Sequence, residues 1–336
     1  MAKKDTTATI AVFGFEGCSA WITAGLLELF AIANTAIRIE SQRKPLRSRA
    51  TRFECHITSR SGRPVRGSHG VSFAGQRPRG RYDVLIVPPI WCESREDLER
   101  QAMKLRSQGP LLKQLARRST IVAGACSGTV LLADAGLLPG RATTCWWLVD
   151  WFRQKFPHIE LVPDRLVMRD RNTWTAAAGS AYIHLGLDLV RELAGEPAAA
   201  TTARLMLVER RRGSQSPFIP AEPVVRAGGD AEIQRAMQYL DGHAGRKLAI
   251  AEACRALGIS ERTLARRFRA SIGMSPLGYL QSRRVARAKQ LLEETSLPLE
   301  RILERCGYED LSSFRKLFVR QVGMTPREYR SRFAAG

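Results

Sequence analysis

Two stretches near the C-terminus carry nearly the same sequence, GMSPLGY at residues 273–279 and GMTPREY at residues 323–329. They lie 50 residues apart. Upstream, CRALGIS at 254–260 resembles LERCGYE at 303–309 with a spacing of 49, so the second copy holds one extra residue in its turn. A repeat of this length indicates a duplicated structural unit.

Each copy has the pattern of a helix, a glycine-containing turn and a second helix, which predicts a helix-turn-helix. Gly258 marks the first turn, and Ser260 is a suitable N-cap for the helix that follows. A helix from Tyr279 to Glu294 is expected to hold the two units apart. Apolar pairs spaced i, i+4 anchor the second helix of each unit to its core, namely Leu264 with Phe268 and Phe314 with Phe318.

The remaining faces of the two second helices carry arginine, lysine and serine, which suit guanine edges and phosphates. From residue 230 onward there are twenty Lys and Arg against twelve Asp and Glu, which fits a DNA-facing surface. One chain with two such helices can read two groove segments about 34 Å apart. A basic bundle with solvated arginines and a nonspecific architectural DNA binder are the alternatives. The duplicated turn-and-anchor pattern favours the helix-turn-helix.

At these residues the chain resembles the AraC/XylS family of bacterial transcription regulators, and the resemblance covers the last hundred residues without a gap. It implies binding to double-stranded promoter DNA, usually beside RNA polymerase and usually as an activator. Ala265 departs from the polar residue often found at its position, which leaves it contact with a thymine methyl group. By motif position, the predicted DNA-binding residues are Arg262, Thr263, Ala265 and Arg266 in the first unit, and Ser312, Ser313, Arg315 and Lys316 in the second.

Composition limits the class of protein. The 336 residues suggest two domains, and the net charge of +21 favours a polyanionic partner. No stretch approaches the 18–20 apolar residues that a membrane span needs, and no signal peptide is expected. The seven cysteines are scattered and form no CxxC pair, so we expect no metal site, no cofactor and a reducing cytoplasm.

The N-terminal part alternates strand and helix patterns, which predicts a doubly wound parallel sheet. Composition changes after about residue 208, and the Pro- and Gly-rich run over 209–229 is interpreted as a linker. The expected domains are therefore 1–208 and 230–336. The predicted strands are 8–14, 53–59, 82–88, 120–125 and 173–178, the predicted helices are 19–34, 96–118, 127–135 and 181–194, and 40–52 is a predicted loop.

The run AGACSGTVLLADAGLL at 123–138 places Cys126 between a buried strand and a helix. At such an elbow the helix N-terminus lowers the thiol pKa and backbone amides can stabilise an oxyanion. A buried structural cysteine fits the pattern equally well. Over residues 8–208 the chain resembles the PfpI-like class I glutamine amidotransferase domain, which implies a flavodoxin-like α/β sandwich with Cys126 at the elbow.

Catalysis at Cys126 would need a base and an acidic partner. In the relatives that the resemblance implies, a histidine often follows the Thr-Thr pair, but here Cys145 occupies that place. The acidic residue would fall near Ser19, and Glu16 is two or three residues out of register. We therefore expect a non-catalytic sensor of a small-molecule effector. A cysteine hydrolase with a DNA-targeting domain is the second hypothesis.

The sequence does not identify the effector. Trp21, Trp91, Trp146 and Trp147 would approach the elbow and could box a quaternary ammonium group. Regulators of this architecture respond to amino acids or to carnitine-like and betaine-like compounds, so the resemblance implies one of these classes. A redox sensor and a homodimer are further alternatives. The ligand-pocket candidates are Cys126, Ser127, Cys145, Trp146 and Trp91.

Overall fold

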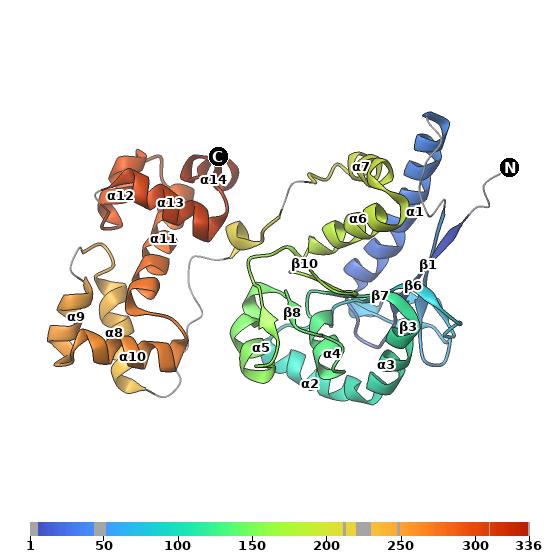
Figure 1. The fold of residues 1–336 in the computed structure, drawn as a ribbon, viewed down its shortest axis with the longest axis horizontal. Coiled ribbons are helices and arrows are strands. Elements are labelled where there is room, and N and C mark those ends of the chain that lie inside the picture. The colour runs from blue at the N-terminus through green and yellow to red at the C-terminus, as the bar shows by residue number, and fades with distance from the viewer. Residues whose placement is uncertain are drawn as a thin grey trace. The chain divides into compact units, whose positions relative to one another are not determined.

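The computed structural model describes residues 6–43, 52–210, 213–219, 230–246, 249–308 and 310–334. The chain divides into two compact units, Met1–Gln215 and Ser216–Gly336, which are described separately (Figure 1). The linker expected at 209–229 stays a prediction, because residues 211–212 and 220–229 lie outside the described residues.

The N-terminal unit is built on a seven-stranded sheet with the order β10-β11-β7-β6-β1-β2-β5. All neighbouring strands are parallel except β10 and β11. The strands are β1 (Thr7–Phe13), β2 (Arg52–Thr58), β5 (Gly75–Gln76), β6 (Tyr82–Val87), β7 (Ser119–Ala125), β10 (Val167–Asp170) and β11 (Thr173–Ala176).

The parallel sheet that the sequence predicts is confirmed, and one edge pair, β10 with β11, is antiparallel. Asp170 pairs with Thr173, so only Arg171 and Asn172 connect β10 to β11. A two-residue connection allows only an antiparallel pair, because parallel neighbours need a long crossover. Arg171 has a φ of 55°, as such tight hairpin turns require.

Helices cover both faces of the sheet, as in a flavodoxin-like sandwich (Figure 1). One face carries α1 (Ala20–Arg43), α6 (Ala181–Ala194) and α7 (Glu196–Leu205), which pack on one another. The other carries α2 (Arg95–Leu105), α3 (Gly109–Arg117) and α4 (Gly128–Asp134). Shorter elements are α5 (Val149–Lys155) and two small sheets, formed by β3 (Val65–Arg66) with β4 (Ser72–Phe73) and by β8 (Arg141–Ala142) with β9 (Glu160–Leu161).

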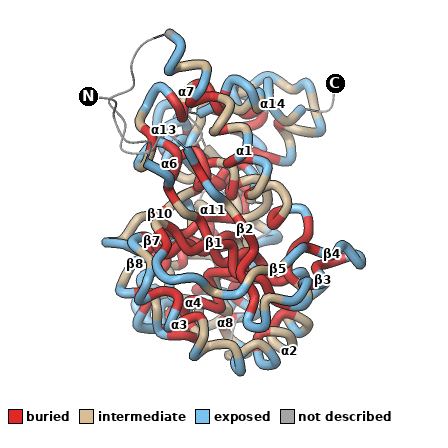
Figure 2. Tube along the Cα trace, turned by 90° about the vertical axis from the view of Figure 1, so that its right-hand side faces the viewer, coloured by how far each residue is buried: buried red, intermediate tan, exposed pale blue. Residues whose placement is uncertain are grey.

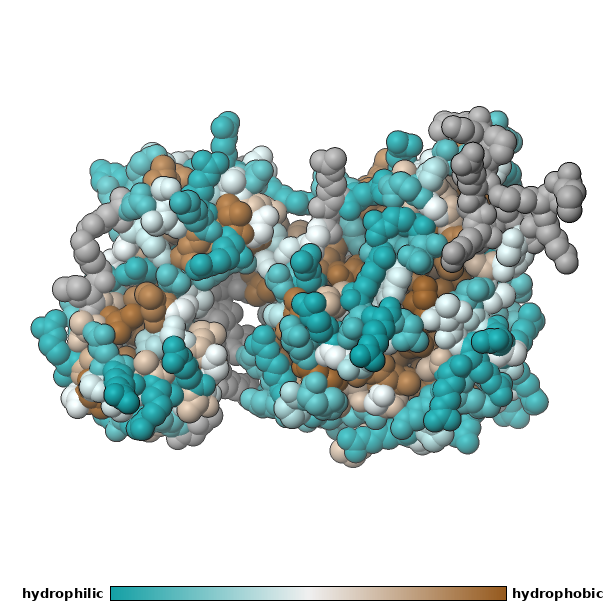
Figure 3. Space-filling view, in the orientation of Figure 1, coloured by the Kyte–Doolittle hydropathy of each residue, from teal (hydrophilic) through white to brown (hydrophobic). Residues whose placement is uncertain are grey.

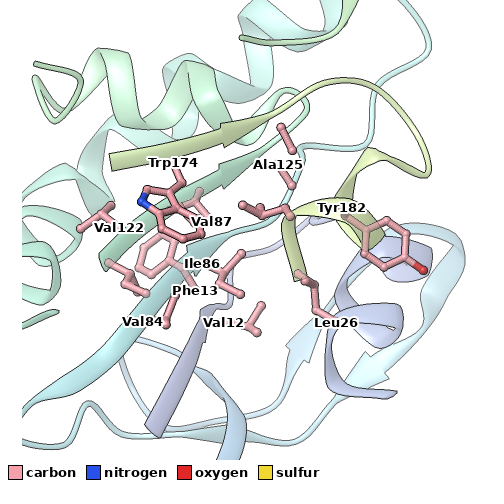
Figure 4. Packing of buried hydrophobic residues seen from close by; sticks show 14 of the residues in the cluster. Val12, Phe13, Leu26, Val84, Ile86, Val87, Val122, Ala125, Trp174 and Tyr182 are labelled. Carbon is pink, nitrogen blue, oxygen red and sulfur yellow. The ribbon is translucent and has the colours of Figure 1, made fainter. Parts of the chain in front are cut away.

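The core lies between these layers, where the central strands are buried along most of their length (Figure 2). Figure 4 shows Phe13 of β1, Val84 of β6, Val122 of β7 and Trp174 of β11 in one cluster. Continuous apolar runs such as YDVLIV in β6 are typical of strands covered on both faces, so the buried strands were readable from sequence.

Helix α1 corrects two expectations. It runs to Arg43 rather than ending near residue 34, so residues 40–43 of the predicted loop are helical, and 44–51 lie outside the described residues. The window Ala20–Gln42 is also long and apolar enough to cross a membrane by length and composition. Half of that window is buried, because α1 packs against β2, α6 and α7. Its apolar character is thus accounted for by its place in the core.

The helix expected over 96–118 is broken in two. A 3-10 turn at Arg106–Gln108 separates α2 from α3, and α3 begins Gly109-Pro110. Proline lacks an amide proton and its ring clashes with the carbonyl four residues earlier, so it can start a helix but not continue one.

The C-terminal unit consists of helices joined by turns and has no strand among its described residues. Its first half holds α8 (Ala231–Gly242), α9 (Ala249–Leu257) and α10 (Glu261–Ile272), and its second half holds α12 (Leu299–Arg305), α13 (Leu311–Val322) and α14 (Pro326–Phe333). Helix α11 (Pro276–Glu294) connects the halves. The turns contain Gly258 and Gly307 with φ of 65° and 73°, and the second turn is one residue longer before its cap, as the repeat predicts.

The repeat is also present in the side-chain packing. Phe268 meets Tyr279 with ring centroids 5.8 Å apart, and Phe318 meets Tyr329 at 5.7 Å, again with an offset of 50 residues. Each pair belongs to its own buried cluster, one around α8–α10 and one around α12–α14. Two separate cores of similar design follow from the duplicated sequence.

We predict that Phe268→Ala and Phe318→Ala destabilise different halves of the C-terminal unit. Removing a buried phenylalanine ring costs about 3–5 kcal/mol. In hydrogen–deuterium exchange of the full chain, Phe268→Ala should speed exchange in α9 and α10, and Phe318→Ala in α13 and α14. Each variant is the control for the other. Equal loss of protection in both halves would show that the cores are one cooperative unit.

Candidate functional site

The second helix of the first unit, α10, is held by its ends and by its buried face. The Ser260 hydroxyl caps it by accepting from the Thr263 amide at 3.2 Å, as predicted. Leu264 and Phe268 are fully buried. Arg262 and Arg266 are exposed on the opposite side, whereas Thr263 and Ala265 are half-buried. Burial of one face thus leaves the two predicted arginines in solvent.

The second helix of the second unit, α13, has the same design with a stronger cap. The Asp310 carboxylate accepts from the amides of Ser312 and Ser313 at 3.1 and 2.7 Å. The pKa of Asp310 is lowered most by a hydrogen bond from the Ser313 hydroxyl and then by the hydrogen bonds from these two amides. The predicted side chains Ser312, Ser313, Arg315 and Lys316 are all exposed.

The exposed cations of the two helices are free to meet a ligand. Within the described part of the chain, Arg262, Arg266, Arg315 and Lys316 form no ion pair. Arg267 differs, because it pairs with Asp230 and Glu232 and so ties α10 to the start of α8. On the face of this unit shown in Figure 3, hydrophilic side chains surround smaller apolar patches.

The elbow predicted at Cys126 is present between β7 and α4. Cys126 has a φ of 52°, a left-handed conformation that few side chains adopt. Its amide donates to the Ala176 carbonyl of β11 at 2.9 Å. A Cβ at Gly128 would lie 2.3 Å from the Val87 carbonyl oxygen, so only glycine fits where α4 begins against β6. The strain at Cys126 is supported by this close packing.

Cys145 lies beside Cys126, in the place where the resemblance implies a histidine. The hydrogen bond from the Cys145 thiol is the largest cause that lowers the pKa of Cys126, and it outweighs the effect of burial. The amides of Ser127 and Gly179 lower that pKa further. The pKa of Cys145 is raised well above its usual range by burial and by the same hydrogen bond. Cys126 is therefore the thiol that ionises first.

The elbow has no histidine or carboxylate among the groups that set the pKa of Cys126. Glu16 is exposed and accepts from the Arg66 amide at 3.2 Å. His184 is buried in α6, and His56 is buried against Tyr82. A thiol in place of the base cannot take a proton from Cys126 at neutral pH, since Cys145 is itself protonated there.

Loops from several strands gather at the carboxyl edge of the sheet around the elbow, which is where open α/β sheets bind ligands. The Ser127 hydroxyl donates to the Ile90 carbonyl at 3.0 Å, and the Trp91 amide donates to the Gly17 carbonyl at 2.9 Å. His69 lies edge-on to the Trp91 ring, with centroids 4.7 Å apart. The loops after β1, β2, β6 and β7 therefore meet at this edge.

The predicted pocket residues are only partly brought together. The Thr144 hydroxyl links Cys126 and Cys145, and Trp91, which is 44% exposed, follows Ile90, whose carbonyl accepts from the Ser127 hydroxyl. Trp146 is half-buried and Trp147 exposed. Trp21 instead lies edge-on to Tyr182, 5.9 Å between centroids. Among the residues that the structure describes, no two of these four tryptophan rings contact each other, so the box is not preformed.

Three residues of this site escaped the sequence reasoning. The Thr144 hydroxyl donates to the Cys126 carbonyl at 3.0 Å and lies 3.8 Å from the Cys145 sulfur. Cys92 is close enough for its charge to act on Cys145 and to feel that of Cys126. His69 reaches Trp91 through a turn with a φ of 55°. The available signals were the position of Cys92, four residues after the predicted strand at 82–88, and the Thr-Thr pair that contains Thr144.

Among the described residues, no cluster of three His, Cys, Asp or Glu side chains is suited to hold a metal ion.

Comparison with known families matches residues 253–332 to a helix-turn-helix domain and residues 29–192 to the DJ-1/PfpI family. The two matches fall in the two compact units.

Transcriptional regulators from Pseudomonas aeruginosa are among the similar proteins. The HTH-type transcriptional regulator ArgR is 30% identical over 68% of this chain and 69% of its own length. The HTH-type transcriptional regulator CdhR is 28% identical over 92% of this chain and 88% of its own length.

Among solved structures, an AraC family transcriptional regulator from Pseudomonas putida is similar to 59% of this chain and 99% of its own. The identity is 17% and the TM-score is 0.42. The identity to ArgR over two thirds of both chains, together with the two family matches, establishes the relationship. The chain therefore belongs to the AraC/XylS family of helix-turn-helix transcriptional regulators, with a DJ-1/PfpI domain in its N-terminal part, and is a DNA-binding regulator of transcription.

Proposed function

We propose that this protein is a ligand-responsive activator that reads promoter DNA through α10 and α13. The carrying observation is the pair of matching helices, each buried on one face and each presenting cations that have no ion-pair partner among the described residues. Base edges would be read by the exposed and half-buried positions on these helices, which are Arg262, Thr263, Ala265, Arg266, Ser312, Ser313, Arg315 and Lys316.

Alanine at Arg262 or Arg266 should weaken binding to the cognate operator by about 5- to 150-fold, because a bidentate contact to guanine contributes about 1–3 kcal/mol. Fluorescence anisotropy with operator and scrambled duplexes measures the selectivity. Arg235→Ala, at an exposed position of α8, is the matched control and should bind normally. Equal losses on both duplexes would instead identify a nonspecific binder.

We further propose that the domain over 1–208 is a non-catalytic sensor, joined by 209–229 to a DNA-binding domain over 230–336, in a cytoplasmic protein. The elbow supplies a thiol whose pKa is lowered and two amides, but its neighbouring side chain is a protonated thiol rather than a base. Binding without turnover is what such a pocket supports. A hydrolase that uses Cys126 is the competing function, favoured only by the lowered pKa of that thiol.

Cys126→Ala separates these two functions. A sensor should keep basal operator binding and show no hydrolysis of amides or activated esters either before or after the change. Measurement of both activities on the same full-length preparations makes the comparison direct. Turnover by the unaltered protein that vanishes in Cys126→Ala would replace the sensor by a cysteine hydrolase.

For the effector we propose an amino acid or a small quaternary ammonium compound at the carboxyl edge of the sheet. Trp91 supports this choice, since its exposed ring lies beside the elbow and is held by His69. An exposed aromatic face attracts a cation by about 0.5–2 kcal/mol.

Isothermal titration with free amino acids and with trimethylammonium compounds should find a ligand, and Trp91→Ala should weaken a cationic one by about 2- to 30-fold. Met103→Ala, at an exposed position of α2, is a control that should leave the affinity unchanged. Absence of heat across the whole panel would remove support for both ligand classes.

The chain itself would carry the response from one unit to the other, through the segment that follows Gln215. The Gln215 side chain donates to the carbonyls of Thr144 and Pro163 at 2.9 and 2.6 Å, next to Cys145. Three residues later the Phe218 ring packs edge-on against Phe333 of α14, with centroids 5.2 Å apart. A ligand that displaces the Thr144 loop would therefore act on a segment anchored in the second helical core.

A further inference from the structure

One edge of the N-terminal sheet carries a row of arginines that the proposed function does not use. Residues 52–81 hold seven arginines, no lysine and a single acidic residue, Glu54. Within the described part of the chain, only Arg79 among the seven has an ion pair, with Glu54 at 3.5 Å. All seven are exposed, namely Arg52, Arg60, Arg63, Arg66, Arg77, Arg79 and Arg81.

Three of these arginines meet at one corner of the sheet. The sheet ends at β5, a strand of two residues that pairs only with the last two residues of β2. The loop after β2 carries Arg60 and Arg63, and Arg77 follows β5 directly. The two segments touch, since Nε of Arg77 donates to the Ser61 carbonyl at 3.3 Å. These three side chains therefore gather near the carboxyl end of β2.

Two further arginines continue the row along the outside of β2. Arg79 lies beside Glu54, four residues before the end of the strand, and its amide donates to the Tyr82 hydroxyl at 2.7 Å. Arg52 is the first residue of β2. A strand rises about 3.3 Å per residue, so the seven residues of β2 give the row a length of about 20 Å. Figure 2 shows β5 at the margin of the unit. We call this row the edge stripe, and it consists of Arg52, Arg60, Arg63, Arg77 and Arg79.

The edge stripe differs from the mixed charges elsewhere on this unit. On α2, for example, Arg100 pairs with Asp97 at 3.1 Å. The first acidic residue after the stripe, Asp83, is half-buried, and its carboxylate accepts from the Thr9 amide of β1 at 2.7 Å. Its charge is thus directed to the neighbouring strand rather than to the arginines. Positive charge concentrated in this way attracts a polyanion.

We propose that the edge stripe binds the phosphate backbone of duplex DNA beside the operator. All its cations are guanidinium groups, whose planar forks match phosphate oxygens better than a lysine ammonium does. A duplex carries one negative charge per about 1.7 Å of its axis, so a stripe of about 20 Å meets several phosphates. The contact goes beyond the proposed function, in which only α10 and α13 bind DNA. It carries no sequence information and adds affinity that falls with salt.

Exposed charges at the edge of a sheet also prevent two copies of a protein from pairing edge to edge. That role needs charge but no partner. It predicts that neutral side chains at these positions cause association of the protein and leave DNA binding unchanged. The two explanations therefore differ in a measurable result.

The test compares two duplexes, one with the operator alone and one extended on each side by about two helical turns of unrelated sequence. Fluorescence anisotropy with the full-length protein measures both affinities. Two or three phosphate contacts, each with a salt slope of about 0.9, should reduce the advantage of the longer duplex by about 10- to 40-fold between about 50 and 200 mM salt. Binding to the shorter duplex measures α10 and α13 separately, so failure of either contact is recognised by itself.

The triple variant Arg60→Gln, Arg63→Gln, Arg77→Gln should bind both duplexes alike, with unchanged affinity for the shorter one. Lysine at the same three positions retains the charge and should retain most of the advantage. Circular dichroism confirms that each variant is folded. The matched control neutralises three exposed arginines of the same unit that have acidic partners and should behave as the unaltered protein. Its substitutions are Arg100→Gln, Arg153→Gln and Arg191→Gln.

Four results would overturn the proposal. The first is an equal affinity of the unaltered protein for the two duplexes at low salt. The second is an equal loss in the matched control, which would assign the effect to the net charge of the unit. The third is the same loss with lysine as with glutamine. The fourth is association of the glutamine variant in size-exclusion chromatography with an unchanged advantage of the longer duplex, which would assign the arginines to protection of the edge.

Discussion

The packing of α11 into two cores is the constraint on which the DNA-binding unit depends. Its first turns place Tyr279 and Leu280 in the core of α8–α10, and its later turns place Val285, Ala288 and Leu292 in the core of α12–α14. Because one continuous helix belongs to both cores, the two outward-facing helices α10 and α13 cannot turn independently. The duplicated fold is thus one unit that presents two separate helices, α10 and α13, on its surface.

The two equivalent tyrosines of the repeat each have a hydrogen-bond partner for the hydroxyl group. The Tyr279 hydroxyl donates to Asp241 at 2.8 Å, and the Tyr329 hydroxyl donates to Glu293 of α11. Burial, followed by the hydrogen bond to Asp241, raises the pKa of Tyr279 well above its usual range. Both buried rings therefore carry a satisfied polar end, which favours one packing arrangement over alternatives.

Much of the architecture was predictable because it rests on local rules. In the first helix-turn-helix, Gly258 determines the turn, Ser260 the N-cap and Phe268 the buried face. The repeat predicts the same features in the second. The buried strands were equally clear. Short elements were not, since the four residues of β10 carry no period, and its antiparallel direction depends on the turn at Arg171. The length of α1 was missed because its polar C-terminal turns follow an apolar run.

For the candidate site, sequence indicated the elbow but not its neighbours. The strain at Cys126 and the glycine at 128 follow from a strand-to-helix turn, whereas the contact of Cys145 with Cys126 depends on how a distant loop folds back through Thr144. His69 and Cys92 likewise come to this site from loops that follow other strands. Residues that meet only through the tertiary fold have no pattern in the chain, so they could be named only from the structure.

The most direct test of the central claim is selection of bound duplexes from random DNA by the full-length protein, followed by hydroxyl-radical footprinting of the selected site. The account predicts one preferred sequence with two protected major-groove segments whose centres lie about one helical turn, roughly 34 Å, apart on the same side of the duplex. Recovery of unrelated sequences bound with equal affinity, or protection of a single segment, would contradict it.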